Sequence, residues 1–135
     1  KNTHNKRVVV TGHSLGAAVA TLFASRIKAE QLYTFGSPRV GNKDFVKTLT
    51  VSHWRFVNNN DVVPSTPIPP LYFHDGTLKY IDSNGNIVDK TFFGRMLDKV
   101  LGRLKSWWNF QLFDGVRDHS VTKYKVLLDG ISSKM

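Results

Sequence analysis

One stretch, residues 8–18, constrains the fold more than any other part of this 135-residue chain. It opens with three consecutive valines, which favour a parallel strand covered on both faces because no polar residue alternates with them. Ser14 follows between Gly12 and Gly16, a G-x-S-x-G spacing that is typical of a sharp turn from a strand into a helix. We expect both glycines to be required, because neighbours press close to the serine of such a turn and a Cβ would clash. The stretch therefore predicts a strand, a turn and a helix, with the Ser14 hydroxyl raised at the carboxyl end of a sheet.

The residues after the turn predict an amphipathic helix from Leu15 to about Ala29. Its smallest residues allow the helix backbone to approach the sheet closely, and these are Gly16, Ala17 and Ala20. Six other apolar residues share one helical face, and these are Leu15, Ala18, Val19, Leu22, Phe23 and Ile27. The alternative is an ordinary strand-to-helix turn that happens to carry a serine. The helix favours the interpretation of Ser14 as a nucleophile, because it supplies the structural context that the motif requires.

Composition excludes several classes of protein. A hydrophobic content of 41% is ordinary for a folded domain, and no apolar run approaches the roughly 20 residues that span a bilayer. The chain has no cysteine, which excludes disulfides and thiolate chemistry and leaves its redox compartment and localisation open. A formal net charge of +9 favours anionic partners. No zinc-ligand spacing, RNA-recognition signature or helix-turn-helix pattern accompanies that charge, so we do not expect nucleic acid as a partner.

The remaining sequence predicts an α/β fold, in which a mostly parallel sheet carries helices on both faces. Residues 31–35 form a second strand, so that strand, helix and strand follow one another as in a βαβ unit. The other expected elements, in chain order, are a short helix at 43–48, a strand at 53–57, a hairpin of strands at 71–74 and 78–81, a returning strand at 87–88 and a helix at about 120–128.

A nucleophilic serine needs a base to take its proton and an acid to orient the base. In α/β-hydrolases these residues follow the order serine, acid, histidine along the chain. The candidate acids are Asp61, Asp75, Asp82, Asp89, Asp98, Asp114 and Asp118. Asp61 is favoured, because it alone directly follows a predicted core strand and lies in a turn at the carboxyl edge of the sheet. The alternative is an ordinary asparagine–aspartate turn.

The candidate bases are His4, His13, His53, His74 and His119. His4 lies in a basic leader, His53 opens a strand and should lie at the opposite end of the sheet, and the His13 side chain should point away from that of Ser14. His74 is expected on an edge hairpin, as a surface or packing residue. His119 is favoured over His74, because it follows Asp61 and precedes the last helix, whose positive end favours neutral imidazole.

Four blocks of sequence resemble those of the class 3 lipases, the fungal triacylglycerol lipase family. They are residues 10–18 (VTGHSLGAA), 33–42 (YTFGSPRVGN), 55–64 (RFVNNNDVVP) and 118–120 (DHS), the last followed by Tyr124. The resemblance implies a Ser14–His119–Asp61 triad that hydrolyses carboxylic esters of lipids through an acyl-enzyme intermediate. It implies an oxyanion donor at the Leu15 N–H, because Leu15 follows the nucleophile, and no cofactor or metal.

The family carries several strands, a lid helix and a second oxyanion donor before the serine block, whereas seven residues precede Val8 here. We therefore expect residues 1–135 to form one domain, the C-terminal part of an α/β-hydrolase lipase domain without the upstream strands and lid. The first strand would then have one unpaired side, and loss of one oxyanion donor would slow catalysis roughly 10²–10³-fold. The alternative function is a non-catalytic lipase-like module that binds a partner or a lipid surface.

Residues 92–108 predict a basic amphipathic helix. One face carries Phe93, Met96, Leu97, Val100, Leu101, Leu104 and Trp108, and the cations off this face are Arg95, Lys99, Arg103 and Lys105. The favoured interpretation is a helix that packs its apolar face on the sheet. The alternative is contact with an anionic lipid surface through residues 92–113, because Trp107, Trp108, Phe110 and Phe113 would form an apolar patch near His119.

Overall fold

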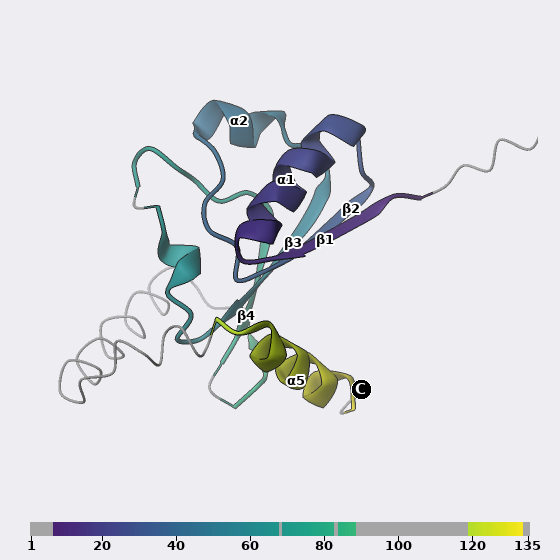
Figure 1. Cartoon of the computed structure of the whole chain (residues 1–135), viewed down its shortest axis with the longest axis vertical. Helices are drawn as coiled ribbons and strands as arrows, with labels where there is room; N and C mark the ends of the chain where they lie inside the picture. Colours follow the sequence, from purple (N-terminus) through teal and green to yellow (C-terminus); the bar gives the residue numbers. More distant parts are fainter. Residues whose placement is uncertain (1–6, 68, 83, 89–118, 134–135) are drawn as a thin grey trace, which may run out of the picture.

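The computed structural model describes residues 7–67, 69–82, 84–88 and 119–133. A five-stranded sheet forms its centre, with the strands side by side in the order of the chain (Figure 1). The strands are β1 Val9–His13, β2 Gln31–Phe35, β3 Ser52–Asn58, β4 Thr77–Ile81 and β5 Ile87–Val88. The pairs β1–β2, β2–β3 and β3–β4 are parallel, and β5 returns antiparallel to β4. The prediction of a mostly parallel sheet is confirmed.

The described helices are α1 Leu15–Ile27, α2 Lys43–Thr48, the 3₁₀ turn η1 Val63–Ser65 and α5 Val121–Ser132. The chain leaves α1 through Lys28, which adopts the left-handed conformation with φ 52°. Asn42 caps α2 by accepting a hydrogen bond from the Phe45 N–H at 2.9 Å. α2 has the predicted bounds, α1 ends two residues before the predicted end, and α5 continues four residues beyond the predicted end.

The predicted hairpin between residues 71–74 and 78–81 is wrong. Phe73 instead makes an isolated antiparallel bridge to Gly41, with its N–H donating to the Gly41 carbonyl at 2.8 Å. Gly76, at φ 74°, lies so close to β3 that a Cβ there would be 2.6 Å from the His53 carbonyl oxygen. Gly76 thus places the chain beside the start of β3, and β4 begins at the next residue and runs parallel to β3.

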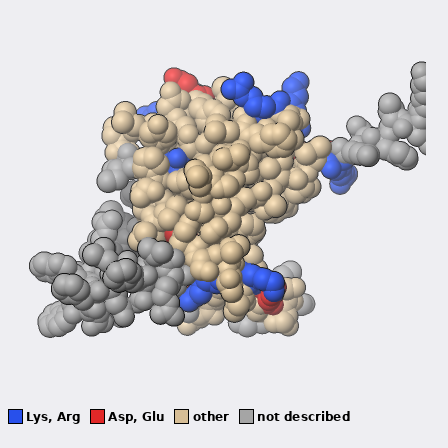
Figure 2. All heavy atoms as spheres, in the orientation of Figure 1, with Lys and Arg blue, Asp and Glu red and all other residues tan. Residues whose placement is uncertain are grey.

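Helix α1 packs on the sheet through its small residues, as the sequence predicts for Ala17 and Ala20. The buried residues of this face are Ala17, Ala20, Thr21 and Ala24, and two of the alanines form a core cluster with Leu32 of β2. The opposite face is exposed within the described part of the chain and carries Leu15, Val19, Leu22, Phe23 and Ile27. In Figure 2 the surface over α1 is largely uncharged, with Lys and Arg gathered at its margins.

Strand β1 differs from the prediction of a strand covered on both faces. Val8 is 40% exposed and Val9 is 54% exposed, and among the described strands β1 pairs with β2 alone. One hydrogen-bonding edge of β1 therefore has no strand beside it in the described part of the chain.

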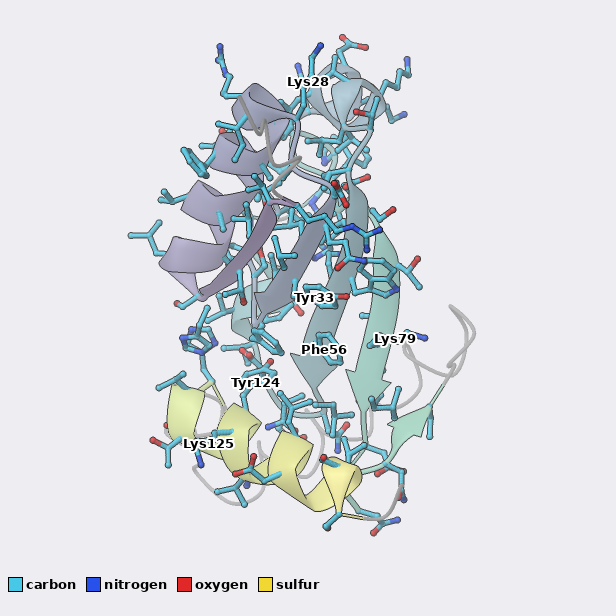
Figure 3. The ribbon with its side chains drawn as sticks, turned by 90° about the vertical axis from the view of Figure 1, so that its right-hand side faces the viewer. Lys28, Tyr33, Phe56, Lys79, Tyr124 and Lys125 are labelled. Atoms are coloured by element: carbon cyan, nitrogen blue, oxygen red, sulfur yellow. The ribbon has the colours of Figure 1, made fainter. Side chains whose placement is uncertain are left out.

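The sheet face opposite α1 carries two stacked aromatic pairs. The rings of Tyr33 and Trp54 lie 5.0 Å apart, as do those of Phe35 and Phe56. Helix α5 lies across the carboxyl end of the strands (Figure 3), and its buried Tyr124 meets the Phe35 ring edge-on at 6.1 Å. This contact fixes the start of α5, and with it His119, against the edge where β1, β2 and β3 end.

Candidate active site

Ser14 stands at the turn between β1 and α1 in a strained backbone conformation. Its φ of 58° and ψ of −130° lie outside the regions that residues with a Cβ favour. Its N–H donates to the Phe35 carbonyl at 3.0 Å, which ties the turn to the end of β2. A Cβ on Gly12 would lie 2.7 Å from the Gly16 carbonyl carbon, so Gly12 is required as predicted. The prediction that Gly16 is also required is wrong, because a Cβ there would meet no atom of the described residues within 4 Å.

The structure brings three of the predicted side chains into one hydrogen-bonded relay. His119 Nε2 lies 2.5 Å from Ser14 Oγ, and His119 Nδ1 lies 2.9 Å and 3.0 Å from the two carboxylate oxygens of Asp61. A carboxylate only accepts, so Nδ1 carries the imidazole proton and Nε2 is left to accept from the serine hydroxyl. The Asp61 side chain is fully buried, whereas that of His119 is 15% exposed. In this arrangement the imidazole can take the Ser14 proton while the carboxylate holds its other side.

Asp61 is a fully buried carboxylate whose oxygens are saturated with donors. Oδ2 accepts from the Tyr124 hydroxyl at 2.7 Å, and Oδ1 accepts from the Val63 N–H at 2.9 Å. The Tyr124 hydroxyl oxygen in turn accepts from the Asn58 N–H at 2.9 Å. Burial of a charge is tolerated when such partners are present. Tyr124 follows the fourth sequence block, but its role in holding the acid was not predicted.

Arg39 holds the loop that follows Asp61. Its guanidinium donates to the carbonyls of Ser65 and Pro67, the latter at 2.7 Å, and its own N–H donates to the Thr66 carbonyl at 2.7 Å. Partial burial lowers the pKa of the Arg39 guanidinium from its usual value. The clamp links the end of β2 to the loop after β3, and its signal in the sequence is the arginine of the second block.

Gly36 lies beneath the contact between base and acid. It follows β2 at φ 58°, and a Cβ there would be 2.7 Å from Asp61 Oδ2 and 2.9 Å from His119 Nδ1. Only a residue without a side chain leaves room for the carboxylate and the imidazole to meet. Sequence reasoning missed this position, although the second block contains it.

His13 also lies in the site. Its Nε2 is 2.6 Å from the backbone carbonyl oxygen of His119, and the two imidazole rings lie 4.7 Å apart at an interplanar angle of 30°. Its ring also meets Tyr124 edge-on at 5.7 Å. The sequence predicts that the His13 side chain points away from that of Ser14, and it does not indicate that the His13 ring contacts the base.

Leu15 begins α1, directly after Ser14. The first N–H groups of a helix have no partner within the helix, so they are available to an anion. The Leu15 N–H belongs to the first turn of α1, and its role as an oxyanion donor stays a prediction. The Leu15 side chain is 74% exposed.

The other described candidates lie elsewhere. His53 Nε2 is 2.8 Å from Thr34 Oγ1 and its Nδ1 is 3.1 Å from Asp75 Oδ2, at the opposite end of β3 as predicted. His74 Nε2 donates to the Pro64 carbonyl at 2.7 Å. Asp82 accepts from the backbone of its own turn.

Other predictions fall on residues outside the described ranges. The amphipathic segment 92–108, its extension to Phe113, and the candidates His4, Asp89, Asp98, Asp114 and Asp118 all lie there. Within the described ranges, no helix is long and apolar enough to cross a membrane. Across those same residues, no three His, Asp or Glu side chains gather in a way that would hold a metal ion.

Several curated proteins similar to this chain are named as lipases. A secreted mono- and diacylglycerol lipase A from Penicillium cyclopium is 38% identical over 102 residues, covering 70% of this chain and 33% of the relative. Triacylglycerol lipase OBL1 of Ricinus communis is 36% identical over 103 residues, covering 62% of this chain and 20% of the relative. The chain thus spans a third or less of the length of these relatives.

Solved structures agree with the fold described above. A lipase from Rhizopus microsporus var. chinensis matches with a TM-score of 0.51 and 35% identity, over 57% of this chain and 31% of that one. The triacylglyceride lipase of Rhizomucor miehei matches with a TM-score of 0.51 and 34% identity, over 58% and 34%. Residues 1–70 of the 135 match the family described as Lipase (class 3). The chain is a member of the class 3 lipase family and has part of an α/β-hydrolase fold.

Proposed function

We propose that this chain carries the nucleophile, base and acid of a serine hydrolase that cleaves the carboxylic ester bonds of acylglycerol-type lipids. The observation that supports this most directly is the relay from Ser14 Oγ to His119 Nε2 at 2.5 Å and from His119 Nδ1 to Asp61 at 2.9 Å. A serine hydroxyl is a weak nucleophile until such a base takes its proton. A buried, saturated carboxylate stabilises the imidazolium that results.

The proposed reaction has two halves. Ser14 Oγ attacks the ester carbonyl carbon while His119 Nε2 takes its proton, and the carbonyl oxygen becomes an oxyanion that the Leu15 N–H stabilises. The carbon–oxygen bond to the alcohol then breaks as His119 returns the proton to the leaving oxygen, so that the acyl group remains on Ser14. A water molecule attacks the acyl-enzyme with His119 again as base, and the fatty acid leaves with Ser14 restored.

The substrate class rests on the family and on the relatives, whose names specify mono-, di- and triacylglycerol lipases. The expectation that residues 1–135 form the C-terminal part of a longer lipase domain stays a prediction. In such a domain, sequence outside this chain would supply the lid and the second oxyanion donor. The rate of the chain by itself would then be about 10²–10³-fold below that of the longer form.

Covalent labelling with a fluorophosphonate probe tests the proposal. The probe phosphonylates an activated serine, so we expect labelling of this chain, and faster labelling of any longer natural form. Ser14→Ala should abolish labelling, because no other group in the relay can form the bond. Ser25→Ala is the matched control, since Ser25 lies on α1, away from the relay, and donates to the Leu22 carbonyl.

Labelled wild type and Ser25→Ala, with unlabelled Ser14→Ala, would support the assignment of the nucleophile. The hydrolysis rates of mono-, di- and triacylglycerols would then define the substrate. A folded protein that stays unlabelled in every natural form would contradict the proposal and favour the non-catalytic lipase-like module.

A further inference from the structure

We propose that His13 is a positioning residue for the base, which it holds through the backbone of His119; this inference rests on the proposed function. The two histidines are 106 positions apart in the sequence, yet His13 Nε2 lies 2.6 Å from the His119 carbonyl oxygen. A carbonyl only accepts a hydrogen bond, so Nε2 of His13 carries a proton and donates it.

His13 is well placed for this task, because it belongs to the most constrained part of the site. It is the last residue of β1, where it pairs with Phe35 of β2 in the parallel register. The next residue is Ser14, whose own N–H is fixed to the Phe35 carbonyl at 3.0 Å. The end of one strand therefore carries both the nucleophile and the group that holds the base.

His13 binds the backbone of His119, a part of that residue to which Asp61 makes no hydrogen bond. Asp61 binds Nδ1 and fixes the rotation of the His119 ring, whereas His13 fixes the main chain from which that ring projects. The His13 ring also lies 4.7 Å from the His119 ring and limits its movement on that side. Two anchors, one on the ring and one on the backbone, define where His119 Nε2 meets Ser14 Oγ. Displacement of a reacting group by about 1 Å costs roughly 10²-fold in rate.

Three substitutions in the full chain separate the hydrogen bond from the ring contact. Glutamine places an N–H donor the same number of bonds from Cα as His13 Nε2, without the ring. Phenylalanine keeps an aromatic ring without the donor, and alanine removes both. We expect His13→Phe and His13→Ala to lower the rate of fluorophosphonate labelling about 10–100-fold, and His13→Gln to restore most of it. In steady-state ester hydrolysis, the loss should appear in kcat with KM nearly unchanged, because the substrate contacts remain.

A second readout does not depend on catalysis. The imidazole N–H resonances of His119 report its hydrogen bond to Asp61, and we expect His13→Phe to shift the Nδ1–H resonance and His13→Gln to return it. A His13→Phe protein with wild-type labelling and unchanged His119 resonances would overturn the inference. If wild-type protein does not label, the proposed function fails, and the His119 resonances of the three variants still decide whether His13 positions that side chain.

Discussion

Two residues of the site, Ser14 and Gly36, have a positive φ, which strains the backbone of Ser14 but not that of Gly36. Ser14 has φ 58° and a side chain, a conformation that costs roughly 1–3 kcal/mol and persists only when its surroundings hold it. Its N–H bond to Phe35 and the start of α1 supply that support. Gly36 also has φ 58° but carries no strain, and its missing side chain leaves the space in which His119 meets Asp61.

Gly36→Ala tests the importance of that space. The added Cβ would lie within 3 Å of both the Asp61 carboxylate and the His119 ring, so the two groups must move apart. We expect the labelling rate to fall about 100-fold. Gly85→Ala is the matched control, because Gly85 has φ 76° and a Cβ there would meet only Leu127 Cδ2, at 3.4 Å, among the described residues.

Urea unfolding should show that both alanine variants lose about 1 kcal/mol or more of stability through the strained φ, with a larger loss in Gly36→Ala because its added Cβ overlaps Asp61 and His119. The labelling rate should fall in Gly36→Ala alone. Equal labelling rates in the two variants would show that the space beside Gly36 does not control the relay.

At the scale of elements, α1 shows that periodicity identifies a helix more reliably than it identifies the buried face. The larger apolar residues of α1 share one face, and such a face commonly turns toward a core. In the described structure the sheet instead packs against the face of α1 that carries the alanines, with Ala17 fully buried and Ala24 1% exposed. Small side chains let the start of the helix lie close to the ends of β1 and β2, which the turn at Ser14 requires.

Substitutions on the two faces of α1 should therefore differ in cost. We expect Ala24→Leu to reduce the free energy of unfolding of this chain by about 1–3 kcal/mol, because the added atoms overpack the contact with Leu32 and its neighbours. Leu22→Gln, on the exposed face, should change it by less than about 0.5 kcal/mol, since leucine and glutamine have similar helix propensities. Urea unfolding of both variants provides the measurement. A larger loss for Leu22→Gln than for Ala24→Leu would contradict the described packing.

At the scale of the whole molecule, the site collects groups from distant parts of the chain at one edge. Ser14, Gly36 and Asp61 follow β1, β2 and β3, and His119 immediately precedes the N-cap residue of α5. Parallel strands end on the same side of a sheet, so the residues after them become neighbours whatever their separation in sequence. Helix α5 then delivers the base, docked through Tyr124.

Residues 92–113 still have two interpretations, packing against the sheet or contact with anionic lipid. The change that separates them is replacement of Trp107 and Trp108 by alanine. Lipid contact predicts weaker sedimentation with anionic vesicles and an unchanged Tm, because apolar side chains that insert into lipid do not support the core. Packing against the sheet predicts that the double substitution lowers the Tm and that vesicle binding depends only on charge. Zwitterionic vesicles serve as the control for charge, and a variant unchanged in both measurements would contradict both interpretations.

The sequence by itself determined the local elements and the three side chains of the relay. Valine runs, a glycine-flanked serine and turn-forming asparagines act over a few residues, so β1, α1, β2, α2 and the end of β3 were predicted within two residues. The choice of Asp61 and His119 followed from chain order, strand ends and family resemblance, and the catalytic roles of these residues stay a proposal.

The tertiary structure decided what depends on contacts between distant segments. Three features follow from which segments of backbone become neighbours in the folded chain. They are the pairing of β4 with β3, the face of α1 that stays exposed, and the free space beside Gly16 that a Cβ could occupy. The same holds for the support of the relay. His13 and Tyr124 make hydrogen bonds shorter than 3 Å to residues far away in the chain, and Gly36 leaves free the space that a Cβ would fill. Local propensity carries no information about such contacts, because they form only after the sheet has brought its strand ends together.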